Sequence, residues 1–300
     1  MPGFRSRSRR ADRLPEAGRE SAGSPAVAAL ARDRTLIMAI LNVTPDSFYD
    51  GGVIKDKRDA IRRAVRMAND GADIIDVGGE STRPGAAEVS TDEELSRVIP
   101  VIDAIAKRVR IPISVDTRKS AVAEEAIRHG ASMINDVSGL NHDAGMALVA
   151  ARYGVPVILM HMRSTPRDMQ TKTDYRDVVR DVMEELGSAV RRAVSSGISK
   201  DRIVIDPGIG FSKTAEQNLE ILNRLREFRS MGLPVCVGLS RKSFIGALLG
   251  RGDPLERLAG TIASCAVAVT NGADILRVHD VREARDAAIV AEGIANMKVG

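Results

Sequence analysis

The hydrophobic pattern of the chain is a series of short apolar runs separated by longer stretches of helical period. The runs are nearly continuous rather than alternating, which is typical of strands whose two faces are both buried in a parallel sheet. Eight such runs predict eight strands. They cover Leu36–Leu41, Asp73–Val77, Ile111–Val115, Ser132–Asn135, Val155–Met160, Ile203–Ile205, Pro234–Gly238 and Ile275–Val278.

The stretches between these runs predict helices. In Tyr175–Ser195, for example, apolar residues recur every three or four positions with charged residues opposite. Several stretches stop at a glycine just before a strand, as at Gly130 and Gly197, and glycine takes the left-handed conformation that ends a helix. Eight strand–helix units match a (β/α)8 TIM barrel. An open doubly wound sheet is the structural alternative, but no GxGxxG motif follows the first strand.

Residues 1–34 differ in composition from the rest, and we expect a disordered basic extension before a barrel domain at 35–300. They hold eight arginines and four acidic residues and lack a buried-strand pattern. No apolar core of a secretory signal follows the basic start, and the acidic residues argue against a transit peptide. The whole chain has 44 basic and 40 acidic residues, so the part after residue 34 has 36 of each. The barrel is therefore neutral, and the net charge of +4 belongs to the extension.

Composition excludes several classes of function. The neutral barrel and its low aromatic content, five Phe and three Tyr without Trp, argue against a nucleic-acid partner. The longest apolar runs are far shorter than the ~20 residues of a membrane span, so we expect no membrane association. Cys236 and Cys265 lie in apolar stretches and form neither a disulfide framework nor a metal cluster. We interpret both as buried core residues of a cytoplasmic protein.

Polar residues collect where the predicted strands end. In a barrel of this type, the carboxyl ends of the strands form one rim, and chemistry takes place there. Any one of these residues could instead cap the following helix, but the whole set predicts a binding site. The residues are Asn42, Asp116, Asn135, Asp136, His161, Asp206, Ser240, Arg241, Lys242, Arg277 and His279.

Two loops near this rim narrow the chemistry. The segments 42–52 and 78–85 are rich in Gly, Pro and Ser, which is compatible with mobile lids over an active site. Arg83, Arg277 and His279 can converge on an anion, and the side-chain oxygen of Asn42 suits Mg²⁺. The residues alone thus predict a site for a heterocycle with a phosphorylated arm.

Eight motifs then resemble one family, the dihydropteroate synthases, in order along the chain from about Thr35 to the final helix. The motifs are NVTPDSF, VGGESTRPGA, SVDTRK, INDVSG, LMHMR, DPGIGF, GLSRKSFIG and ILRVHDV. The resemblance implies a (β/α)8 barrel that condenses 6-hydroxymethyl-7,8-dihydropterin pyrophosphate with 4-aminobenzoate, yielding 7,8-dihydropteroate and pyrophosphate. It also implies a homodimer, inhibition by sulfonamides and Mg²⁺ as the cofactor.

The resemblance further implies the role of individual residues. The pterin-binding residues would be Asp116, Asn135, Met160, Asp206, Lys242 and Arg277. Pyrophosphate would be bound by Asn42, Thr82, Arg83, Arg277 and His279, with Asn42 as the metal ligand. The 4-aminobenzoate pocket would consist of Phe48, Pro84, Phe211, Lys242 and Ser243. Asp50 and Thr82 would belong to the two lid loops, and the catalytic residues would be Asp116, Lys242, Arg277 and His279.

The implied mechanism is dissociative, with an anionic Asp116 favouring a pterin methylene cation. Two positions depart from the family pattern, because Ser164 and Ser212 stand where glycine is usual. Both are loop positions beside the pocket, so they bear on substrate affinity rather than on the type of reaction. Two alternatives remain open. A methyltransferase from methyltetrahydrofolate to a corrinoid protein would not need the pyrophosphate-binding residues, and a non-catalytic pterin-binding paralogue would have no leaving group to stabilise.

Overall fold

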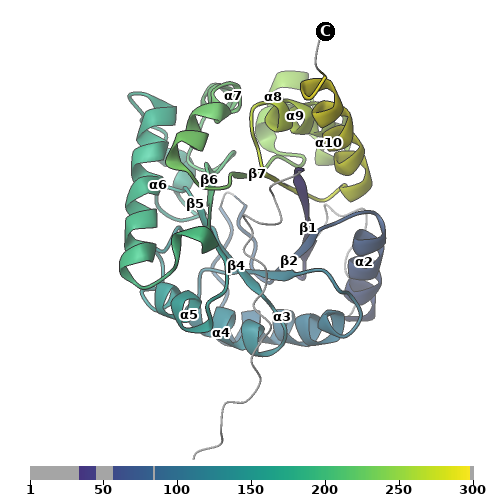
Figure 1. The fold of residues 1–300 in the computed structure, drawn as a ribbon, viewed down its shortest axis with the longest axis vertical. Coiled ribbons are helices and arrows are strands. Elements are labelled where there is room, and N and C mark those ends of the chain that lie inside the picture. Colours follow the sequence, from purple (N-terminus) through teal and green to yellow (C-terminus); the bar gives the residue numbers. More distant parts are fainter. Residues whose placement is uncertain (1–33, 45–56, 84, 298–300) are drawn as a thin grey trace, which may run out of the picture.

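The computed structural model describes residues 34–44, 57–83 and 85–297. Within them, eight parallel strands form a ring surrounded by helices (Figure 1). The strands are β1 Leu36–Asn42, β2 Ile74–Gly78, β3 Ile113–Asp116, β4 Met133–Asp136, β5 Val157–Met160, β6 Ile203–Asp206, β7 Cys236–Gly238 and β8 Ile275–Val278. All eight predicted strands are confirmed, with ends that differ by at most two residues.

The helices follow the strands in alternation, as the pattern predicted. The α-helices are α2 Lys57–Asn69, α3 Thr91–Ala106, α4 Ser120–Arg128, α5 Met146–Tyr153, α6 Val178–Ser195, α7 Ala215–Asn223, α8 Ser243–Leu249, α9 Leu258–Thr270 and α10 Val281–Ala295. Short 3-10 turns are η1 Met169–Thr171, η2 Lys200–Arg202, η3 Leu225–Met231 and η4 Pro254–Arg257. None of the helices described is long and apolar enough to cross a membrane.

The order of the strands confirms the barrel rather than the open sheet. Hydrogen-bonded neighbours run β6-β5-β4-β3-β2-β1-β8-β7, and every pair is parallel. The two ends of this series meet at one bridge between Ile205 and Val235, where Ile205 N–H donates to the carbonyl of Pro234 at 2.9 Å. The ring therefore closes between β6 and β7 through a minimal contact.

Local sequence signals place the helix ends. Gly130 and Gly197 have φ angles of 112° and 95° just after α4 and α6, as predicted. Helix α6 begins three residues later than the predicted Tyr175, because the Asp177 side chain accepts the N–H groups of Val179 and Arg180 and caps the helix. The outward faces of the strands pack against the apolar faces of the helices in one large core. Residues 1–33 of the predicted extension 1–34 lie outside the described residues, as do residues 45–56. Arg34 is described, and its guanidinium pairs with the Asp73 carboxylate at 2.5 Å.

Candidate active site

Side chains that point into the barrel form two layers. The first layer is apolar and contains Leu36, Met38, Ile74, Met133, Ile158, Val204, Cys236 and Ile275. Because side chains alternate between the two faces of a strand, the next inward position lies two residues further on. At the carboxyl ends of the strands these positions hold a largely polar set. Its members are Asp76, Asp116, Asn135, Met160, Asp206 and Arg277.

Arg277 of β8 is the centre of this layer. Its Nε donates to Asp76 Oδ2 at 2.7 Å and its Nη2 donates to Asp116 Oδ2 at 2.5 Å. Asn135 Nδ2 also donates to Asp76 Oδ2, at 3.0 Å. One network therefore joins side chains from β2, β3, β4 and β8 across the mouth of the barrel. The predicted residues Asp116, Asn135 and Arg277 do come together.

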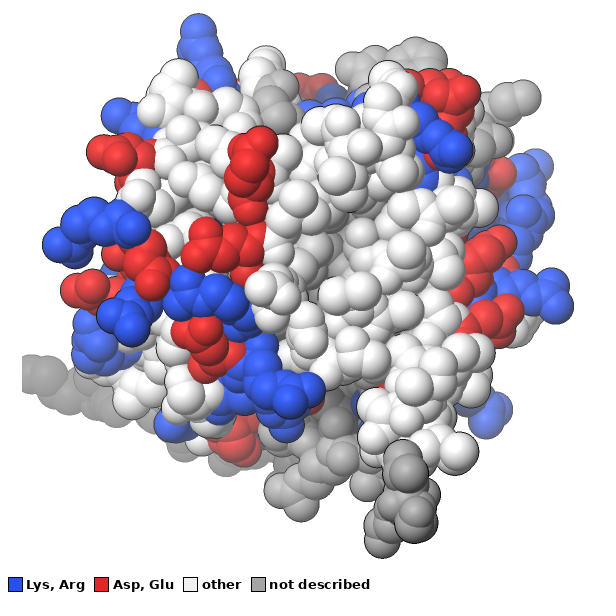
Figure 2. Space-filling model, turned by 90° about the horizontal axis from the view of Figure 1, so that it is seen from above, with Lys and Arg blue, Asp and Glu red and all other residues white. Residues whose placement is uncertain are grey.

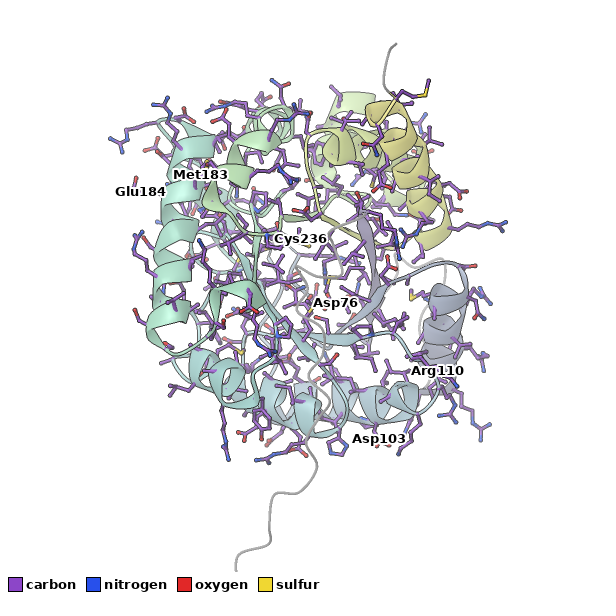
Figure 3. All side chains as sticks on the ribbon, in the orientation of Figure 1. Asp76, Asp103, Arg110, Met183, Glu184 and Cys236 are labelled. Carbon is purple, nitrogen blue, oxygen red and sulfur yellow. The ribbon has the colours of Figure 1, made fainter. Side chains whose placement is uncertain are left out.

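Asp76 is the member of this network that sequence reasoning missed. It is fully buried, and Figure 3 shows it within the ring of strands together with Cys236. Its second oxygen, Oδ1, has no hydrogen-bond partner among the described residues. The available signal was a carboxylate inside an apolar run, two residues before the end of β2. The prediction considered only the residues that leave the strands.

The carboxylates of the mouth have perturbed acidity. Burial raises the pKa of Asp116 to about 7, against the effect of Arg277 and with the help of the nearby Asp76 carboxylate. Burial also raises the pKa of Asp206, although the Lys242 ammonium and the N–H of Gly208 oppose this. Groups with strongly shifted pKa values inside a polar mouth are typical of functional sites.

Asp206 and Lys242 lie on the β6–β7 side of the mouth. Asp206 Oδ1 accepts the N–H of Gly208 at 2.7 Å, and Lys242 Nζ donates to the carbonyl of Ile209. Burial lowers the pKa of Lys242 to about 8, against the attraction of Asp206. The ammonium also lies 4.7 Å from the ring centroid of Phe211, a cation–π contact. Phe211 and Lys242 thus lie in contact beside Asp206.

The predicted anion-binding residues lie at the ends of β1, β2 and β8. Asn42 pairs with Gly78 in the sheet, and Gly78 pairs with Asp116. Burial and the charge of Arg277 lower the pKa of His279 to about 3, and Arg83 is close enough to contribute to this. His279 is therefore neutral at pH 7.

Three predicted residues cannot be placed. Phe48, Asp50 and Pro84 lie outside the described residues. Thr82 lies in the described part of the loop after β2 and is half-buried.

A buried cluster of ion pairs holds the start of the loop after β2 in place. Glu80 accepts from Arg118 and Lys119, both at 2.5 Å, and Lys119 also donates to Glu94 at 2.6 Å. These four side chains are all less than a tenth exposed. The ion pairs therefore fix Glu80, two residues before Thr82 in the same loop.

Other residues of the predicted rim set have structural roles. Asp136 points away from the barrel interior and accepts the N–H groups of Ser138 and Leu140. Arg241 pairs with Asp280 at the start of α10. His161 lies behind the mouth, between Glu185 and Lys213. These three residues organise loops around the site.

The two cysteines are buried and unbonded, as predicted for core residues. Cys236 belongs to the apolar layer inside the barrel. Burial raises the pKa of Cys265 to about 12, which removes any thiolate at neutral pH.

The residues present fit a magnesium ion that binds through its substrate. Within the described ranges, no group of three or more His, Cys, Asp or Glu side chains could hold a metal by itself. Mg²⁺ commonly takes one or two protein oxygens and completes its shell with water and phosphate oxygens. Asn42 offers such an oxygen, which would lie 3.6 Å from a Cβ built on Gly78, next to the Asp116 carboxylate.

Comparison with known proteins identifies the family. Residues 38–279 match the pterin binding enzymes. The dihydropteroate synthase of Escherichia coli is 49% identical over 262 residues, which cover 87% of this chain and 92% of that protein. The dihydropteroate synthase of Bacillus subtilis is 48% identical over 265 residues, with 88% and 90% covered.

Solved structures of dihydropteroate synthases have the same fold as this chain. A dihydropteroate synthase from Yersinia pestis, in complex with a sulfonamide drug, has a TM-score of 0.85 and 44% identity, covering 88% of this chain and 95% of that one. The Xanthomonas albilineans enzyme with 4-aminobenzoic acid has a TM-score of 0.83 and 44% identity, covering 89% and 95%. The chain therefore belongs to the pterin binding enzyme family, among the dihydropteroate synthases.

Proposed function

We propose that the mouth of this barrel condenses 6-hydroxymethyl-7,8-dihydropterin pyrophosphate with 4-aminobenzoate to give 7,8-dihydropteroate and pyrophosphate. The observation that carries the proposal is the network across the mouth, in which Asp76 and Asp116 accept from Arg277 and Asp76 also accepts from Asn135. In this proposal the network supplies acceptors for the pterin and a cation for the pyrophosphate. Relatives that match this chain over most of both lengths support it, since all those compared above are dihydropteroate synthases.

The hydrogen bonds within the site predict how it recognises a pterin. The amide nitrogen of Asn135 is committed to Asp76, which leaves the Asn135 carbonyl oxygen to accept a ring N–H. Asp206 uses Oδ1 for Gly208, which leaves Oδ2 for the 2-amino group. Lys242 donates to the pterin carbonyl or N5, and Met160 and the Arg277 guanidinium cover the faces of the ring.

Substitution begins when the C–O bond to pyrophosphate breaks. The electron pair leaves with pyrophosphate, and the pterin methylene carbon becomes a cation that the electron-rich ring stabilises. The Asp116 carboxylate favours this cation electrostatically. The amine of 4-aminobenzoate then forms the new C–N bond and loses a proton. No covalent enzyme intermediate is needed, which agrees with the inert cysteines.

Pyrophosphate departs toward Asn42, Thr82, Arg83, Arg277 and His279. His279 is neutral, so it acts as a hydrogen-bond donor, and the arginines supply positive charge. Asn42 would hold Mg²⁺ together with the phosphates of the substrate. When bound, the ion adds positive charge that stabilises the leaving group.

The second substrate binds next to Phe211 and Lys242. Their common surface suits the aromatic ring of 4-aminobenzoate, and Ser243 offers its hydroxyl and backbone N–H to the carboxylate at the start of α8. Phe48 and Pro84 would complete this pocket. A sulfonamide would occupy the same place.

We further propose a cytoplasmic homodimer formed through the end of the molecule that holds α7 to α10. Exposed apolar side chains follow one another on these helices, including Val267 on α9 and Ile289, Val290 and Ile294 on α10. Figure 2 looks down on this end and shows a broad surface without charged side chains. Such a surface exceeds what scattered exposed residues produce and suits a second copy of the chain.

The test is incubation with the pterin pyrophosphate, Mg²⁺ and 4-aminobenzoate, with dihydropteroate detected by mass. Formation of dihydropteroate, and its loss when Mg²⁺ is chelated, supports the proposal. A chain that binds the pterin but forms no product would be the non-catalytic paralogue. Methyl transfer from methyltetrahydrofolate to a corrinoid protein would favour the methyltransferase instead.

A further inference from the structure

Ser212 follows Phe211 in the loop after β6 and has a backbone conformation that is unusual for serine. Its φ angle is 52°, in the left-handed region that favours glycine, and its side chain is fully buried. A buried serine held in this region costs free energy unless the surroundings compensate for it. The hydroxyl provides that compensation.

The hydroxyl of Ser212 joins two loops. It accepts the N–H of Arg163 at 3.0 Å and donates to the carbonyl of the same residue at 2.8 Å. Arg163 belongs to the loop after β5, 49 residues earlier in the chain. The Ser212 hydroxyl thus satisfies both the backbone N–H and the backbone carbonyl of Arg163, as a neighbouring strand would do in a β-sheet.

The next residue, Lys213, strengthens the same connection. Its buried ammonium donates to the carbonyls of Phe211 and Gly208, at 2.9 and 3.1 Å, and contacts Nδ1 of His161 at 3.0 Å. Burial lowers the pKa of Lys213 to about 7. His161 follows β5 directly, so both residues after Phe211 tie this loop to the end of β5. Gly208 permits the close approach, because a Cβ there would lie 1.9 Å from the His161 carbonyl oxygen.

The position of the Phe211 ring depends on this connection. The ring packs against a methionine-rich cluster that includes Met160 and Met169, and it meets the Lys242 ammonium on the side of the mouth. We propose that Ser212 is a positioning residue for the second substrate: its bridge to Arg163 holds Phe211 where 4-aminobenzoate binds. This inference rests on the proposed function.

The chain contains a matched control. Ser164 also has a positive φ angle, 68°, but it is exposed, and its hydroxyl donates to Asp168 within its own loop rather than to the loop of Phe211. The expectation that both serines bear on substrate affinity therefore narrows to Ser212, whose hydroxyl makes the connection between the loops. Ser212→Gly and Ser164→Gly therefore relieve the same kind of backbone strain, and only the first removes the bridge. Ser212→Ala removes the bridge and keeps the strain.

The experiment measures kcat and KM for each substrate with the unmodified chain and the three variants. In Ser212→Gly and Ser212→Ala, we expect the KM for 4-aminobenzoate to rise roughly three- to tenfold, about the effect of losing one net hydrogen bond. The KM for the pterin pyrophosphate and the parameters of Ser164→Gly should stay within about twofold of the unmodified chain.

Two results would overturn the proposal: an unchanged KM for 4-aminobenzoate in both Ser212 variants, or an equal rise in the KM of both substrates. Melting temperatures identify a variant that fails to fold, and Ser212→Gly is the variant expected to fold best. If the unmodified chain itself makes no dihydropteroate, the proposed function fails, and calorimetric titration with 4-aminobenzoate still tests the bridge.

Discussion

Replacing Asp206 by asparagine tests the pterin pocket most directly. The carboxylate is 5% exposed, and Oδ1 is occupied by the N–H of Gly208 at 2.7 Å. In the variant, the amide oxygen keeps this bond, so the amide nitrogen takes the place of Oδ2. A donor then faces the 2-amino group of the pterin, which is itself a donor.

The size of the effect follows from the hydrogen bond that is lost. A buried donor without an acceptor costs about 1–3 kcal/mol, which corresponds to a loss of affinity of roughly 5- to 150-fold. The free energy of unfolding should change less than the affinity for the pterin. Burial raises the pKa of Asp206, so the charge is costly to bury and its removal offsets part of the attraction to Lys242 that is lost.

Calorimetric titration with a pterin analogue is the appropriate assay, with Asp201→Asn as the control, because Asp201 is exposed and lies in η2, before β6. The affinity of the unmodified chain should fall as the pH is lowered, because the raised pKa of Asp206 brings its protonation above the usual carboxylate range. Asp206→Asn should lose the part of this dependence that residue 206 contributes and keep the part that Asp116 contributes. Equal affinities of the unmodified chain and Asp206→Asn, with normal melting of both, would refute the placement of the pterin.

Four further outcomes are expected. Because the pKa of Asp116 is about 7, kcat/KM for the pterin pyrophosphate should fall below about pH 7, and a flat profile between pH 5 and 9 would remove Asp116 from the mechanism. Lys119→Ala leaves the buried Glu94 carboxylate without its cation, while Glu80 keeps Arg118, and should cost about 3–5 kcal/mol in urea unfolding. Lys107→Ala, which breaks an exposed pair, should leave the midpoint nearly unchanged. Sulfonamides should compete with 4-aminobenzoate and not with the pterin, as initial rates at varied concentrations of both substrates will show. Removal of residues 1–33 should change neither melting temperature nor turnover, and a loss of more than half the turnover would contradict that.

The fold could be predicted from the sequence because every strand is buried on both faces. Such strands are short apolar runs that stand out from amphipathic helices, and the eight runs needed no tertiary information to be found. Helix starts were harder to place. The start of α6 depends on the cap at Asp177, and the apolar period continues through the cap to Tyr175.

The burial of both strand faces also prevented the prediction of some site residues from the sequence. A strand buried on both faces shows no alternation in its sequence, so the inward face could not be separated from the outward face. Asp76 was missed for this reason, although it lies on the inward face with Asp116 and Asn135. Asp136 was included for the same reason and faces outward. Once one inward residue is fixed, the period of two identifies the rest.

The balance of charge at the mouth gives a physical reason for the proposed magnesium ion. The cations Arg277 and Lys242 face the carboxylates of Asp76, Asp116 and Asp206, so the positive charge there is already offset before any substrate arrives. His279 is neutral and adds no charge. A pyrophosphate ester that approaches this mouth brings several negative charges, and Arg83 adds a cation from the loop after β2. Expulsion of pyrophosphate concentrates still more negative charge on the leaving oxygen, and the proposed Mg²⁺, which Asn42 would help to hold, would supply positive charge to stabilise it. Chelation should therefore slow the bond-breaking step more than it weakens pterin binding, and a titration of pterin affinity in the presence of chelator separates the two effects.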